Sequence, residues 1–182
     1  MRQRKTKLLE RDQLVTWALR ALGGRAYSTG ELREKLRTHA ARLEDIEGVL
    51  AHLKEAGYLD DRRFAENYAA ARLENQGFGK LRVLRDLRQR RVAGKLASDV
   101  ADRTYDGKEE LELVDQFLKR KYRGKQLGPF LADEKNLAAA FRRLRYAGFS
   151  AGASIRVLKR YSREQEALDA LESSDPGEPQ AE

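Results

Sequence analysis

Residues 46–71, IEGVLAHLKEAGYLDDRRFAENYAAA, contain two amphipathic helical patterns separated by a glycine. In the first pattern apolar side chains recur three or four residues apart, at Ile46, Val49, Leu50 and Leu53. Gly57 follows at a position where a helix would end, and the acidic Asp60 and Asp61 stand where the next helix would begin. Side chains at this spacing share one face of a helix, so the stretch predicts two helices that each bury one face.

The same spacing continues on both sides of this stretch, and alternation typical of strands is absent. It recurs near the N-terminus at Leu14, Trp17, Ala18 and Leu22. The prolines stand at positions 129, 176 and 179, so none interrupts the first 128 residues. Ser28 and Glu31 have the spacing of a capping box at a helix start. We expect nine helices, near residues 9–22, 29–39, 43–56, 61–76, 79–91, 94–104, 109–122, 134–147 and 151–161.

This series of short helices predicts an all-α fold of tandem three-helix repeats. Tyr27-Ser28 and Phe78-Gly79 each open a basic amphipathic helix, a weak internal similarity that supports the repeats. Helices this short are marginal alone, so they must bury their apolar faces against neighbours. The expected body is elongated and curved, with a flexible loop near residues 123–133. Its expected parts are a basic arm (1–8), three repeats (9–59, 60–106 and 107–161) and an acidic, disordered tail (162–182).

The chain of 182 residues carries a net charge of +8, distributed unevenly. Residues 162–182 hold seven acids and one base, a net charge of −6, which leaves +14 on residues 1–161. A body this basic favours a polyanionic partner such as nucleic acid, an acidic protein groove or an anionic membrane face. The alternative is that the positive charge only keeps the protein soluble. The acidic tail is interpreted either as plain disorder or as an intramolecular competitor for the basic body.

No segment predicts a membrane span or a secreted protein. Apolar runs such as residues 137–141 are far shorter than the roughly 20 residues that a bilayer requires. The N-terminal Met1-Arg2-Gln3-Arg4-Lys5 is basic, but no apolar segment follows it. Without cysteine the chain has no disulfide and no thiolate metal site. We therefore expect a cytoplasmic protein that does not act on a membrane.

The residues that usually carry catalysis form no recognisable cluster. The histidines, His39 and His52, lie on different predicted helices, and no glycine-rich phosphate loop is present. Asp60 and Asp61 could hold a divalent cation, but adjacent acids at a helix start are better explained as helix caps. A nuclease would need a larger carboxylate cluster than this. We expect no enzyme, no cofactor and no metal.

Three basic runs are the strongest candidates for binding. Residues 79–95 hold seven bases against the single acid Asp86, residues 119–125 hold five bases, and residues 141–160 hold six without an acid. Arginine can bind a phosphate or a carboxylate through two parallel hydrogen bonds, which favours a binding role. The alternative for each run is a charged helix face that only contacts solvent. The residues predicted to contact DNA or a protein partner are Arg33, Lys35, Lys80, Arg82, Arg85, Arg88, Arg142, Arg143 and Arg145.

Aromatic residues stand beside the last two runs, at Tyr122, Tyr146, Phe149 and Tyr161. They could stack on the bases of single-stranded DNA. Core packing is the favoured interpretation, because Phe141, Leu144 and Phe149 fit an apolar stripe at a helix end. Trp17 is likewise expected in the core.

Four collinear motifs resemble the RecX family of recombinase regulators. They are Tyr27-Ser28-Thr29-Gly30-Glu31-Leu32-Arg33-Glu34-Lys35-Leu36, residues 53–65 with Gly57-Tyr58-Leu59-Asp60-Asp61 at their centre, Gly77-Phe78-Gly79-Lys80-Leu81-Arg82, and Leu144-Arg145-Tyr146-Ala147-Gly148-Phe149-Ser150. The resemblance spans residues 14–161. The chain departs from the family at Arg90-Arg91-Val92, where a helix end resembling Lys-Gly-Ile is usual, at the inserted residues 123–133, and in its acidic tail.

The resemblance implies a monomer that lies along the groove of a RecA filament on single-stranded DNA. Such a protein would inhibit RecA's ATP hydrolysis, strand exchange and coprotease activities, and so modulate DNA repair, recombination and the SOS response. It would also bind single-stranded and double-stranded DNA. The alternative is a free-standing DNA- or RNA-binding module that has electrostatic affinity and no RecA partner.

Overall fold

The computed structural model describes residues 8–162, and within them the chain is built from helices. The all-α prediction is confirmed. The helices are α1 (Arg11–Gly24), α2 (Thr29–Arg37), α3 (Asp45–Glu55), α4 (Asp61–Ala71), the π-helix η1 (Arg72–Gln76), α5 (Lys80–Gln89), α6 (Gly94–Tyr105), α7 (Glu110–Lys121), α8 (Leu127–Leu131), α9 (Glu134–Ala147) and α10 (Ala151–Tyr161). Strand-like pairing in residues 8–162 is limited to an isolated bridge between Leu9 and Ala40.

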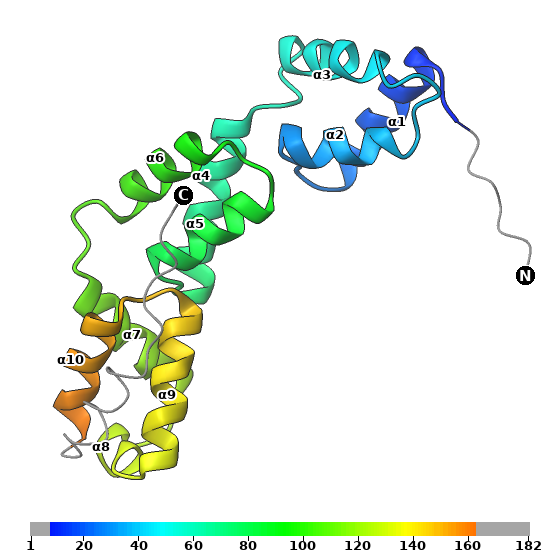
Figure 1. The fold of residues 1–182 in the computed structure, drawn as a ribbon. Helices are drawn as coiled ribbons and strands as arrows, with labels where there is room; N and C mark the ends of the chain where they lie inside the picture. Colours follow the sequence, from blue (N-terminus) through cyan, green and yellow to red (C-terminus); the bar gives the residue numbers. More distant parts are fainter. Residues whose placement is uncertain (1–7, 163–182) are drawn as a thin grey trace, which may run out of the picture. The chain divides into compact units, whose positions relative to one another are not determined.

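The chain divides into two compact units. Unit 1 comprises Met1–Tyr68 and Asp86–Val100, and unit 2 comprises Ala69–Arg85 and Ala101–Glu182. Helices α4, α5 and α6, drawn from teal to green in Figure 1, contribute residues to both units. The division into three repeats therefore stays a prediction. The basic arm and the acidic tail lie outside the described residues, apart from Leu8 and Ser162.

Unit 1 has a core formed by the first three helices, drawn in blue to cyan in Figure 1. Helices α1, α2 and α3 pack against one another in pairs. The fully buried leucines at the centre of this core are Leu14, Leu32, Leu36, Leu50 and Leu53. Trp17 is half-buried against this core, where its ring lies 4.3 Å from that of His39, measured between centroids. The apolar spacing found in the sequence thus marks the buried faces.

Unit 2 has a second core in which α10 packs against α7, α8 and α9. Phe149 is its largest fully buried side chain, and all four helices contribute buried leucines to the same core, at Leu118, Leu131, Leu137 and Leu158. The expected loop at residues 123–133 is wrong in part, because it contains α8. Leu127 and Leu131 lie four residues apart on this helix and are both buried. Ten α-helices are therefore described instead of nine, since a helix this short shows too little periodicity to be recognised.

Local hydrogen bonds at the helix starts explain several sequence signals. Ser28 and Glu31 form the predicted capping box of α2. The Asp60 carboxylate accepts a hydrogen bond from the backbone N–H of Arg63 at 2.9 Å, as a cap does. Asp61 accepts one from the N–H of Thr29 at 2.7 Å, so it caps α2 and not its own helix. Across residues 8–162, no helix has the length and apolarity to cross a membrane.

Candidate nucleic-acid interface

Positive charge is concentrated in unit 2. Among the described residues, unit 1 holds 14 lysines and arginines against 13 acids, whereas unit 2 holds 18 against 9. The net charges are therefore +1 and +9. Basic residues that outnumber acids two to one generate a positive field that attracts polyanions. Unit 2 is thus where a polyanion would bind.

The start of α5 and the end of α9 meet in unit 2 at a pair of glycines. The N–H of Gly79 donates to the carbonyl of Ala147 at 2.8 Å, and the N–H of Leu81 donates to that of Gly148 at 3.3 Å. Gly148 has a φ of 89°, a left-handed conformation that ends α9. A Cβ added to Gly79 would overlap the backbone of Gly148, and one added to Gly148 would overlap that of Arg82. Only glycine allows the two backbones to approach this closely.

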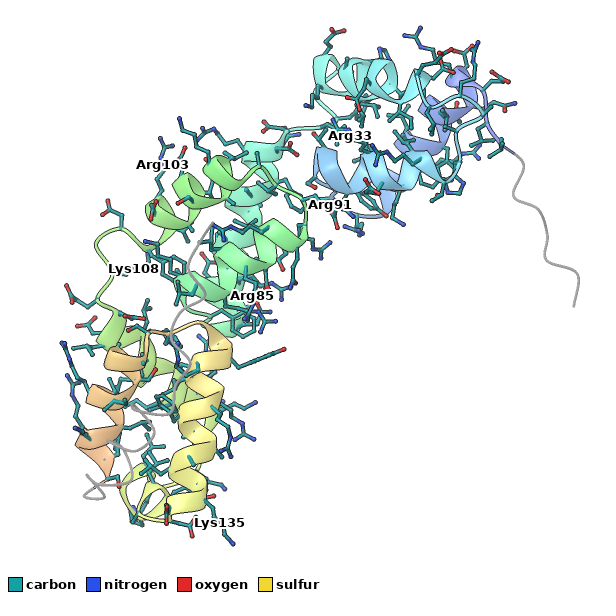
Figure 2. The ribbon with its side chains drawn as sticks, viewed as in Figure 1. Arg33, Arg85, Arg91, Arg103, Lys108 and Lys135 are labelled. Atoms are coloured by element: carbon teal, nitrogen blue, oxygen red, sulfur yellow. The ribbon has the colours of Figure 1, made fainter. Side chains whose placement is uncertain are left out.

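This junction places Tyr146 beside two arginines of α5. Arg82 Nη1 and Arg85 Nη2 donate to the Tyr146 carbonyl at 3.2 and 3.3 Å. Their guanidinium carbons lie 4.4 and 5.9 Å from the centre of the Tyr146 ring, within the range of a cation–π interaction. Tyr146 is nevertheless 66% exposed. Figure 2 labels Arg85 among the side chains of α5. Unit 2 therefore presents an exposed aromatic ring held by cations.

A pocket of about 660 Å³ lies next to this ring. Tyr146, Phe78 and Phe117 supply its aromatic lining, and its cations are Arg120, Lys121 and Arg143. Among the described residues that line it, none is acidic. We call Tyr146, its two arginines and this pocket the arginine–tyrosine surface. Its combination of exposed cations and aromatic rings suits a ligand with negative charge and a flat apolar face.

In a similar helix junction in unit 1, the neighbouring arginines are paired with a carboxylate. Gly30 at the start of α2 abuts Arg91 at the end of α5, and a Cβ there would overlap the Arg91 carbonyl. The Ser28 hydroxyl donates to the Arg90 carbonyl. Glu31 accepts hydrogen bonds from Arg90 at 2.8 Å and from Arg25 at 3.2 Å. Burial acts to raise the pKa of Glu31, but these hydrogen bonds outweigh it and hold that pKa below its usual value.

Six predicted site residues already make hydrogen bonds or ion pairs within the protein, and Arg85 at Tyr146 is one of them. Arg33 forms a two-pronged ion pair with Glu47, and Lys80 pairs with Asp102 at 2.6 Å. Arg143 donates to the Tyr122 hydroxyl at 3.0 Å. Arg145 donates to the Phe149 carbonyl at 2.6 Å, and Arg82 donates to the Tyr146 carbonyl at 3.2 Å. These side chains therefore have structural partners in addition to any external ligand.

Four predicted site residues are fully exposed, namely Lys35, Arg85, Arg88 and Arg142, and of these Arg85 also donates to the Tyr146 carbonyl. Within residues 8–162 no acid lies within ion-pairing distance of them. Arg85 and Arg142 belong to unit 2, whereas Lys35 and Arg88 belong to unit 1. The structure thus brings Arg82 and Arg85 together at Tyr146 but does not gather all nine residues at one place.

The aromatic residues divide as the core interpretation predicts, with one exception. Tyr122 and Phe149 are buried, and Tyr161 is half-buried with its hydroxyl donating to Asp115. Tyr146 is instead exposed, so its assignment to the core is wrong. It lies in the last turn of α9 between the buried Leu144 and Ala147, on the exposed face that also carries Arg142 and Arg143. Arg120, Lys121 and Phe78 were also not predicted as site residues, although the run 119–125 contains the first two.

The histidines and the adjacent acids of the sequence are dispersed in the described residues. Across residues 8–162, no three His, Asp or Glu side chains gather closely enough to hold a metal ion. Asp60 and Asp61 instead accept backbone hydrogen bonds. The two histidines lie apart, with His39 against Trp17 and His52 on α3.

Known proteins share both the sequence and the fold. Residues 60–100 match a family model described as RecX, second three-helix domain. The chain is 35% identical over 132 residues to Regulatory protein RecX of Trichlorobacter lovleyi, a match that covers 72% of this chain and 80% of that protein. It is 30% identical over 166 residues to Regulatory protein RecX of Streptomyces coelicolor, covering 91% and 86%.

A solved structure has a similar fold at much lower identity. The crystal structure of RecX from Lactobacillus salivarius superposes with a TM-score of 0.63 at 17% identity, covering 83% of this chain and 96% of that one. Identity this low supports the fold alone. The relationship to the RecX proteins rests on the two sequence matches, which span most of each chain.

Proposed function

The chain belongs to the RecX family of regulatory proteins, and from this membership we propose that it regulates the RecA recombinase. In this proposal it binds the RecA filament on single-stranded DNA and inhibits RecA's ATP hydrolysis, strand exchange and coprotease activities. It would thereby modulate DNA repair, recombination and the SOS response. It acts as a monomer in the cytoplasm and catalyses no reaction itself.

The observation that carries the proposal is the arginine–tyrosine surface of unit 2. Unit 2 has a net charge of +9 among its described residues, and this surface lacks an acid in its pocket. DNA phosphates and acidic side chains of a protein filament are both anionic, so either would be attracted there. Arg82 and Arg85 of the predicted set lie at this surface, and Arg143 lines its pocket.

The remaining predicted residues are assigned to supporting contacts. Arg88 and Arg142 are exposed and unneutralised within the described residues, so they can meet phosphates or carboxylates without breaking a bond inside the protein. The same holds for Lys35 in unit 1. Arg33 and Lys80 would have to exchange their acidic partners for the ligand. We therefore assign them a smaller share of binding. We also propose that the chain consists of three three-helix modules, with the second within residues 60–106.

The test is RecA's ATP hydrolysis on single-stranded DNA, with DNA in large excess and this protein at a small fraction of the RecA concentration. The proposal expects hydrolysis to fall, because so little protein acts on the filament and cannot sequester the DNA. A matched titration with bovine albumin controls for nonspecific loss of RecA. Unchanged hydrolysis, together with clear binding to naked DNA, would overturn the proposal and favour a free-standing nucleic-acid-binding module.

A further inference from the structure

We infer that Tyr146 is a stacking site for an unpaired base of single-stranded nucleic acid. The inference rests on the proposed function, since it names the ligand of the surface that carries it. It goes beyond the proposed function because it assigns the base and its flanking phosphates to different side chains of the protein. Tyr146 meets the flat face of the base, and the cations of the adjacent pocket meet the phosphates.

The exposure of Tyr146 is the first observation. In the last turn of α9, Leu144 and Ala147 are buried on either side of it, and yet Tyr146 is 66% exposed. Single exposed aromatic residues are common on protein surfaces, so exposure alone assigns no role. What separates Tyr146 from the exposed Tyr58 of unit 1 is the set of cations that surrounds it.

The second observation is that the ring is held in place before any ligand binds. Arg82 and Arg85 both donate to the Tyr146 carbonyl, and both guanidinium groups lie against its ring. The backbone behind the ring is fixed by the hydrogen bond from Gly79 to Ala147 at 2.8 Å. An aromatic side chain that is already ordered loses little conformational entropy on binding. Tyr146 is thus prepared to contact a flat ligand.

The third observation is the charge of the neighbouring pocket. Arg120, Lys121 and Arg143 supply cations there, and Phe78 and Phe117 supply further aromatic surface. Proteins that bind single strands combine a positive groove for the backbone with aromatic rings for the bases. This pocket and Tyr146 reproduce that combination within one unit of the fold.

A single strand fits this surface better than the other anions. In a duplex both faces of each base are covered by neighbouring base pairs, so Tyr146 could not reach them. An acidic peptide would use the arginines but would leave the ring without a partner. An unpaired base with its phosphates uses both, and every base offers an aromatic face, so we expect no strong sequence preference.

The experiment measures the affinity of the full chain for a fluorescently labelled single-stranded oligonucleotide without RecA. Tyr146→Leu removes the aromatic face and keeps an apolar side chain, and we expect binding to weaken about tenfold, within the range known for one stacked base. Tyr146→Phe keeps the face and should bind nearly as well as the wild type. Tyr58→Leu is the matched control, because it removes a similarly exposed tyrosine from unit 1. It should leave the affinity unchanged.

A second strand, identical except that its bases are absent, isolates the stacking contact. The wild type should bind this abasic strand about as weakly as Tyr146→Leu binds the normal strand, and Tyr146→Leu should lose nothing further on it. An equal loss on both strands would overturn the inference, because the ring would not be contacting a base. Retained binding to the normal strand by Tyr146→Leu would overturn it too. Circular dichroism of each variant checks that the helices are intact.

The RecA assay separates this inference from the proposed function. If Tyr146→Leu binds single strands normally and fails to inhibit RecA, the ring contacts protein, and the stacking inference is wrong while the proposed function stands. If the abasic and normal strands differ as expected but the wild type leaves RecA's ATP hydrolysis unchanged, the stacking site stands and the proposed function fails.

Discussion

Units 1 and 2 each join helices through the same kind of junction, yet they use their arginines differently. In unit 1, Gly30 abuts Arg91, and the nearby arginines Arg25 and Arg90 are paired with the carboxylate of Glu31. In unit 2, Gly79 abuts Gly148, and the nearby arginines lie against the ring and carbonyl of Tyr146. Both junctions begin a helix from a segment that opens with Tyr27-Ser28 or Phe78-Gly79, the pair from which the repeat was predicted.

This contrast bears on where binding resides, because the excess of basic residues lies in unit 2. An arginine paired with a carboxylate must give up that partner before it can bind another anion. Arg85, which lies against the Tyr146 ring, is exposed and has no acid within ion-pairing distance among the described residues. The first junction therefore stabilises the fold, while the second leaves the charge of Arg85 available at the surface.

The backbone contact of the second junction should be the most sensitive to substitution. Gly148→Ala adds a Cβ that overlaps Arg82 and forces alanine into a left-handed conformation, so we expect a loss of about 2–5 kcal/mol in the free energy of unfolding. Gly57→Ala is the matched control in unit 1, because Gly57 also has a positive φ, of 75°, but has open space around it. It should cost only about 1–2 kcal/mol. Urea denaturation measures both, and equal losses would contradict the packing argument.

Charge reversal should weaken DNA binding more in unit 2 than in unit 1. Changing Arg85, Lys121 and Arg142 to Glu alters three exposed cations of unit 2, and we expect affinity for single-stranded DNA to fall about 100-fold, with a shallower salt dependence. Changing Arg20, Lys54 and Lys95 to Glu removes the same charge from unit 1 and should have a much smaller effect. Affinity titrations at several salt concentrations compare them. Equal losses would mean that net charge alone governs binding.

Glu31 should give the first junction a dependence on pH. Its pKa in the folded protein lies below the ordinary value of 4.5, because hydrogen bonds from Arg25 and Arg90 outweigh burial. Its stabilisation is therefore fully present above pH 4.5 and is lost as the pH falls through the lowered pKa. We expect Glu31→Gln to cost about 1–2 kcal/mol at pH 7 and progressively less below pH 4.5. Denaturation at each pH measures the cost, and a cost that does not change with pH would exclude this role.

Arg91 should be replaceable by glycine with a small gain in stability. It has a φ of 57°, a left-handed conformation that is unfavourable for residues other than glycine, and it stands where Gly148 stands in the second junction. Its exposed ion pair with Glu34, at 3.9 Å, contributes little. We expect Arg91→Gly to stabilise the protein by about 0.5–1 kcal/mol in urea denaturation. Destabilisation would show that the two junctions are not equivalent at this position.

Much of the fold follows from local sequence. The apolar spacing at Leu50 and Leu53 marks a buried helix face, and the capping box at Ser28 begins α2 where predicted. These features depend on residues within one or two turns of each other, so the sequence displays them directly. The helix α8 was missed because it is held by burial of Leu127 and Leu131 against α9 and α10, and not by its own periodicity.

The site was only partly predictable. The sequence identified Arg82 and Arg85 as binding candidates, and both lie at the arginine–tyrosine surface. It also placed Arg33 and Lys80 in the same set, although each is paired with an acid that is distant in sequence, Glu47 or Asp102. Pairing of this kind depends on how helices pack, which a single segment does not encode.

Local sequence is enough to locate most of the helices, the capping box of α2, the glycines at the second junction and the excess of arginine. The packing of the helices sets which arginines are neutralised, gathers the excess charge in unit 2, and exposes Tyr146 while it buries Phe149, three residues later. The physical reason is the range of the interactions. Capping and periodicity act within a turn of a helix, whereas burial and ion pairing join residues that the chain separates widely.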